Sequence, residues 1–116
     1  MSVTLEPQAQ AREARMQIAN TIIQQLGGPG RLKMMTGAKD FTAIDGGVQF
    51  GIGRNAAGVN KMIVKLTAQD LYDVEFGAVR RVKGMPTYKV LDRTEGAYAD
   101  MLKSLFERAT GMYLSF

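Results

Sequence analysis

Apolar residues recur with a helical period near the start of the chain. Between Gln8 and Leu26 they lie three or four positions apart, and Pro7 suits the first turn of a helix because its missing N–H is not needed there. The run Gly27-Gly28-Pro29-Gly30 ends the pattern, since Gly favours a left-handed C-cap and Pro interrupts the hydrogen-bond ladder. The sequence therefore predicts a helix with an apolar stripe that Ala19 and Ile23 widen. The stripe consists of Ala11, Ala14 or Arg15, Ile18, Ile22 and Leu26. Residues 1–6 show no periodicity and are expected to fray.

The pattern then changes to strict alternation, which is typical of strands. Residues 41–44 and 48–52 alternate around the turn signal Asp45-Gly46-Gly47, which predicts a β-hairpin. Residues 61–67 and 72–76 alternate in the same way and predict two further strands that pair with each other. In that pairing, Lys61 or Lys65 would face Asp73 or Glu75 across the ladder.

Three further segments complete the pattern. Residues 32–39 fit either a short strand at Met34-Met35 or an irregular loop. Residues 80–86 predict a basic loop, and residues 88–91 predict a short last strand. A second helix follows, capped by Asp92 or Thr94 and closed by Gly111, with an apolar face of Tyr98, Met101, Leu102, Leu105, Phe106 and Ala109.

This order of elements predicts an α+β fold. We expect one domain over residues 1–116, with an N-terminal helix, a four- or five-stranded antiparallel sheet and a C-terminal helix, both helices covering one sheet face. Tyr72, Val74 and Phe76 would then point inward, and the other face would carry polar and charged side chains that are solvated or bind a partner.

Composition narrows the chemistry. The 116 residues contain neither Cys nor His, which removes thiol nucleophiles, the commonest general base and the commonest transition-metal ligand. No catalytic constellation is recognisable, so we expect a non-enzymatic protein without a cofactor or metal. No apolar run reaches the roughly 20 residues that a membrane helix needs, and no secretion signal is evident. These features favour a cytoplasmic protein that does not bind membranes.

Positive charge gathers in two blocks. Residues 31–65 carry six Lys or Arg against two Asp, and residues 80–93 carry five Lys or Arg against one Asp, so each block has a net charge of +4. The whole chain also has a net charge of +4 and a pI of about 9.6, which favours anionic partners. The candidate nucleic-acid-binding residues are Lys61, Lys65, Arg80, Arg81, Lys83 and Lys89, although a solvated basic loop is the simpler interpretation. The apolar end of the chain is a candidate partner-binding segment, consisting of Met112, Tyr113, Leu114 and Phe116.

Two weaker motifs favour structure over chemistry. Gly51-x-Gly53-x-x-x-x-Gly58 lacks the Lys-Ser/Thr of a phosphate loop and precedes a strand, so a connecting loop is favoured. Asp70-x-x-Asp73-x-Glu75 is rich in carboxylates, but alternate residues of a strand lie about 7 Å apart. Cross-strand pairing with Lys is therefore favoured over a metal site.

Four ordered segments carry a resemblance to known sequences: MTGAKDF at residues 35–41, LYDVEF at 71–76, EGAYADML at 95–102 and TGMY at 110–113. Together they resemble a family of small uncharacterised proteins of tailed phages and prophages. The resemblance implies an accessory protein that acts in the host cytoplasm, and it implies no residue-specific role.

The leading hypothesis is a binding protein that engages nucleic acid, or a nucleic-acid complex, through its basic loops and open sheet face. The alternative is an inhibitor or assembly factor that binds a host or phage protein through the apolar tail and a sheet edge. Either surface also favours a homo-oligomer.

Overall fold

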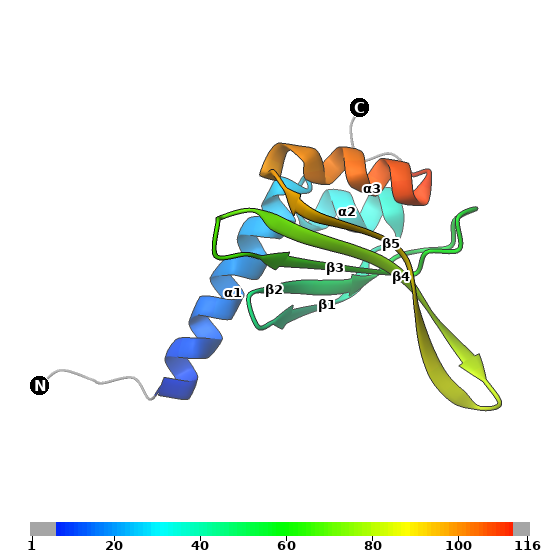
Figure 1. The fold of residues 1–116 in the computed structure, drawn as a ribbon, viewed down its shortest axis with the longest axis horizontal. Helices are drawn as coiled ribbons and strands as arrows, with labels where there is room; N and C mark the ends of the chain where they lie inside the picture. Colours follow the sequence, from blue (N-terminus) through cyan, green and yellow to red (C-terminus); the bar gives the residue numbers. More distant parts are fainter. Residues whose placement is uncertain (1–6, 113–116) are drawn as a thin grey trace, which may run out of the picture.

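The computed structural model describes residues 7–112 (Figure 1), so the predicted fraying of residues 1–6 lies outside the described residues. Three helices and five strands are present in this range, together with one short 3₁₀ helix. They are α1 (Pro7–Gln25), α2 (Pro29–Thr36), β1 (Lys39–Ile44), β2 (Gly47–Gly51), β3 (Lys61–Leu66), β4 (Tyr72–Val82), β5 (Met85–Ala97), the 3₁₀ helix η1 (Ala99–Met101) and α3 (Leu102–Thr110).

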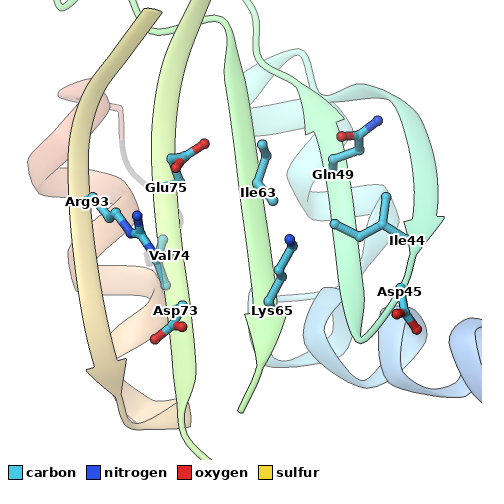
Figure 2. Close-up of a pocket in the computed structure, with 9 residues that line it drawn as sticks. All are labelled: Ile44, Asp45, Gln49, Ile63, Lys65, Asp73, Val74, Glu75 and Arg93. Atoms are coloured by element: carbon cyan, nitrogen blue, oxygen red, sulfur yellow. The ribbon is translucent and has the colours of Figure 1, made fainter.

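The strands form one antiparallel sheet in chain order, β1-β2-β3-β4-β5. Short loops suffice for this arrangement because each strand pairs with the next one along the chain. The helices pack against one face of the sheet, and Figure 2, which looks onto the other face, shows them behind the strands. The predicted α+β fold, with helices at both ends of the chain on a single sheet face, is confirmed.

The core lies between the helices and the inward residues of the strands. Val74 and Phe76 are at most 1% exposed and Tyr72 is 6% exposed, which confirms that these three side chains point inward. They pack with residues of α1 and α3, and the rings of Phe76 and Phe106 meet edge to face with centroids 6.3 Å apart. Alternation along the strands leaves the intervening polar residues on the open face.

Helix α1 follows the predicted stripe only in part, and the side chain of Ala11 lies outside the described residues. Ile22 and Leu26 are completely buried, and Ile18 is half-buried against the core, but Ala14 is exposed. In Figure 1 the first turns of α1 extend past the edge of the sheet, so no strand lies beneath them. The apolar period predicted the helix correctly, whereas its covered length depended on where the sheet ends.

Residues 29–36 form helix α2, so both predicted alternatives for residues 32–39, a strand at Met34-Met35 or an irregular loop, were wrong over most of that segment. The run that ends α1 also begins α2, because Pro29 occupies the first turn, where its missing N–H costs nothing. Leu32 is completely buried beneath the helix, and Gly37 closes it in the left-handed conformation at φ 68°. The strand β1 then begins at Lys39.

The second half of the chain differs most from the prediction. Residues 80–86 are not a basic loop, and the strand predicted at residues 88–91 is present but much longer than predicted. They belong to the long hairpin of β4 and β5, whose strands turn at Lys83-Gly84. Both turn residues have positive φ, 53° and 79°, which matches the twist of a two-residue hairpin. The segment contains β-branched and aromatic residues, which favour strands. Its many charged residues led to the prediction of a loop.

The C-terminal helix begins later than predicted. Asp92 and Thr94 lie within β5 and cap nothing, and Tyr98 is 64% exposed rather than part of the inward stripe. The buried residues of α3 are Leu102, Leu105, Phe106 and Thr110. Gly111 adopts the left-handed conformation at φ 76°, so the predicted C-cap is confirmed.

The predicted partner-binding tail is only partly within the described residues. Met112 is half-buried and packs against the core of its own chain, so its side chain is not fully available to a partner. Tyr113, Leu114 and Phe116 lie outside the described residues.

Within residues 7–112, none of the helices combines the length and apolar character needed to cross a membrane.

Candidate nucleic-acid interface

The most prominent feature of the surface is a two-stranded arm, which we define as residues 79–91. β3 begins only at Lys61, opposite Gly77 of β4, so beyond Gly77 the strands β4 and β5 pair only with each other. Every residue of the arm is exposed, and Figure 1 shows the arm projecting from the sheet. Isolated two-stranded hairpins are only marginally stable in water. The arm therefore depends on its attachment to the sheet.

A β-bulge lies where the arm leaves the sheet. Phe76 pairs with Asp92, but the next residue, Gly77, pairs with Val90, so Leu91 is an extra residue in β5. An extra residue in one strand bends it and increases the local twist. The bulge accounts for the turn of the arm away from the sheet in Figure 1.

Tyr88 fastens the root of the arm to the open face. Its ring covers Gly77, where a Cβ atom would lie 2.5 Å from the ring atoms, so only Gly permits this contact. The Tyr88 hydroxyl donates a hydrogen bond to Oε2 of Glu75 over 2.8 Å, and Nζ of Lys61 lies 5.5 Å from the ring centroid. Partial burial raises the pKa of Tyr88 above its ordinary value, and the hydrogen bond and negative charge of Glu75 raise it further. Tyr88 therefore holds the arm in place and is not free to stack on a base.

Asn60 secures the outer edge of β4 at the same level. Its Oδ1 accepts a hydrogen bond from the Val79 N–H over 2.7 Å, and its Nδ2 donates to the Val79 carbonyl oxygen over 2.9 Å. Asn60 is the residue before β3, and its side-chain amide thus bonds the Val79 backbone at a level that β3 itself does not reach. Sequence reasoning assigned Asn60 only to a polar connection, because a side-chain amide that replaces a backbone pair has no local signal.

Replacement of Asn60 by Ala is expected to loosen the start of the arm. Two hydrogen bonds of about 0.5–1.5 kcal/mol each would be lost, so exchange of the Val79 amide hydrogen should accelerate by roughly tenfold. Native-state hydrogen exchange measures this directly. Asn20→Ala, on the exposed face of α1, is the matched control and should leave Val79 unchanged. If the Val79 amide hydrogen exchanges as slowly in Asn60→Ala as in the unaltered protein, the side-chain amide of Asn60 does not hold the arm.

The structure separates the six predicted cationic residues into two groups. Lys61 and Lys65 lie on the open face of the sheet, where Lys61 is placed over Tyr88 and Lys65 is the register partner of Asp73. The predicted cross-strand pairing is therefore confirmed in register for Lys65 and Asp73. The other four residues lie on the arm, and we call them the arm cations: Arg80, Arg81, Lys83 and Lys89.

The arm cations surround the ribbon. Side chains alternate along a strand, so Arg80 and Lys89 share the face that continues the helix side of the sheet, whereas Arg81 lies on the opposite face. Lys83 is at the turn. Residues 76–91 contain no Asp or Glu, so no carboxylate of the arm itself offsets this charge. Arg80 also donates a hydrogen bond from Nη2 to the Gly58 carbonyl oxygen over 3.4 Å.

A second candidate site is a hollow of about 340 Å³ on the open face (Figure 2). The side chains of Lys65, Asp73, Glu75 and Arg93 project from adjacent strands around it. Arg93 forms an ion pair with Glu95 over 3.1 Å, and Asp73 accepts a hydrogen bond from the Gly96 N–H over 3.1 Å. With Asp45, the lining holds three carboxylates against two cations, so the hollow has no excess positive charge that would select an anion.

The structure shows where the residues of the two weaker motifs lie. The segment after β2 is a loop closed by Asn55, which bonds the backbone of Gly53 and Val59. Within residues 7–112, no group of three or more Asp or Glu side chains is placed to hold a metal ion.

Comparisons of the chain with protein-family models, with curated proteins and with solved structures gave no match.

Proposed function

We propose that this protein is a non-enzymatic accessory protein that binds nucleic acid through the arm. The observation that carries the proposal is the placement of four cations on an exposed ribbon that projects from the domain and contains no Asp or Glu. The major groove of B-DNA is wide enough to admit a two-stranded β-ribbon. Because the arm cations occupy both faces and the tip, they can contact the phosphates that border a groove on either side.

The proposal revises the sequence-based hypothesis in one respect. The open sheet face is a poor site for a polyanion, since Asp73, Glu75 and Glu95 lie beside its lysines. We therefore assign binding to the arm and to Lys61, which lies over Tyr88 at the root of the arm. In the tailed-phage context that the sequence resembles, the ligand would be phage or host nucleic acid in the cytoplasm.

Fluorescence anisotropy with labelled duplex DNA, single-stranded DNA and duplex RNA tests the proposal. If the four arm cations each neutralise one phosphate, log K should fall with log salt with a slope of about −3.6, which is roughly a hundredfold loss between 50 and 200 mM salt. Binding to at least one of these ligands with such a slope is the expected result. Absence of binding to all three at low salt would overturn the proposal.

A protein partner, including a second copy, is the second candidate. β5 lies at the edge of the sheet, and exposed strand edges are templates for pairing with another chain. Val90 and Leu91, which are 47% and 42% exposed, add apolar surface beside this edge. Light scattering coupled to gel filtration tests for a homo-oligomer. Pull-down from host lysate with and without residues 112–116 tests whether the tail recruits a host protein. Capture of the same proteins by both forms would show that the tail is not the binding segment.

A further inference from the structure

The tip of the arm presents two apolar side chains to solvent. Val82 and Met85 are register partners on either side of the Lys83-Gly84 turn, and they are 54% and 68% exposed. Partners in an antiparallel ladder place their Cβ atoms about 4.5–5.5 Å apart on the same face, so the two side chains form one apolar unit. The body of the protein does not cover them, because the whole of residues 79–91 is exposed.

The folding of the arm does not require this apolar pair. A Thr pair at the same two positions would supply comparable cross-strand stabilisation and would be better solvated. The root of the arm is instead held by Tyr88 and Asn60, which lie several ladder steps away from the tip. An exposed apolar pair at the end of a projecting element is therefore best explained by a ligand that covers it.

The charges around the pair indicate what that ligand is. Lys83 occupies the turn, Arg81 lies one ladder step behind on the opposite face beside Pro86, and Arg80 lies two residues behind Val82 on the same face. Cations thus lie near the apolar unit on its own face, on the opposite face and at the turn. Proteins that bend DNA combine these two features, since apolar side chains wedge between base pairs while flanking cations hold the phosphates.

We infer that Val82 and Met85 act as a wedge that enters double-stranded DNA, partly unstacks a base step and bends the duplex. This inference rests on the proposed function and deepens it, because it identifies duplex DNA as the ligand and the arm tip as the element that deforms it. Arg80, Arg81 and Lys83 hold the phosphates on both sides of the insertion. A duplex that is already weakly stacked at one step is the preferred form of the ligand.

Two measurements on the whole protein test the wedge. Fluorescence energy transfer between the ends of a duplex of about 30 base pairs reports bending. Anisotropy competition between this duplex and the same duplex with one mismatched pair reports unstacking, and the mismatched form should bind about tenfold more tightly or better. Val82→Thr/Met85→Thr should abolish both the bending and the preference while retaining the salt dependence, because every arm cation remains.

Val79→Thr/Val90→Thr is the matched control, since it removes the same kind of exposed apolar surface from the arm but away from the tip. It should retain bending and the mismatch preference. Duplex binding with the expected salt slope, but without bending or preference, would overturn the wedge and leave the proposed function intact. Absence of nucleic-acid binding by the unaltered protein would overturn both. Binding to vesicles of anionic lipid but not to duplex DNA would assign the tip to a bilayer and overturn the inference.

Discussion

Replacement of all four arm cations by Gln is expected to remove most of the affinity for nucleic acid. Each cation that neutralises a phosphate releases about one counterion on binding. Without the four arm cations this release is lost, so the slope of log K against log salt should become shallower by about 3.6. At 50 mM salt this corresponds to a loss of affinity of at least about a hundredfold. The fold should be unaffected, because all four side chains are exposed and lie outside the core. Anisotropy titrations at several salt concentrations measure both quantities.

The matched control removes the same charge elsewhere. Arg15, Lys33, Lys103 and Arg108 lie on the helices, and their replacement by Gln lowers the net charge by the same four units as the arm variant. If the arm is the binding element, this variant should retain most of the salt slope. Equal losses in the two variants would mean that binding follows the overall charge of the protein and not the arm.

Gly47→Ala is expected to have the largest effect of any single substitution on stability. A Cβ atom at Gly47 would lie 1.8 Å from the carbonyl oxygen of Val64, with further atoms of the β3 backbone within 3 Å. Relief of this overlap requires β2 and β3 to separate, because the obstructing atoms are backbone atoms of a paired strand. We expect a loss of about 3 kcal/mol or more in the free energy of unfolding, at the upper end of what single substitutions cause. Urea unfolding followed by circular dichroism measures it.

Gly30→Ala makes the same chemical change where space is open. No atom outside its neighbours lies within 4 Å of a Cβ at Gly30, which belongs to the first turn of α2. Ala has the higher helix propensity, so this variant should be neutral or more stable by up to about 1 kcal/mol. Similar destabilisation in both variants would show that the close approach of β2 to β3 at Gly47 is not the cause.

Prediction succeeded where the local pattern and the tertiary packing impose the same requirement. The alternation of Tyr72, Val74 and Phe76 predicted which side chains are buried, and the hairpin signal at Asp45-Gly46-Gly47 predicted the turn between β1 and β2. Both depend on neighbours a few residues away. The assignment of Gly111 as a C-cap is equally local, since the left-handed conformation there follows the end of the apolar helical pattern.

The prediction of α2 failed because propensity and breaker signals conflict over a short segment. Gly28 and Pro29 are strong helix terminators when they follow a helix, but Pro29 also begins one. A helix of eight residues is not stable alone in water, so α2 exists because Leu32 is buried in the core. That contact is between segments, and no local pattern contains it.

The candidate site also depends partly on local sequence and partly on long-range contacts. The amino-acid sequence alone established a single α+β core, the absence of Cys and His chemistry, and the cationic block at residues 80–93. It did not establish that this block is a projecting hairpin, because the strand character of the arm depends on pairing between residues as far apart as Gly77 and Val90. The start of β3 at Lys61, the bulge at Leu91 and the contacts of Asn60 and Tyr88 are long-range features. They arise only when the strands assemble, and they place the arm cations and the apolar tip at one end of the molecule.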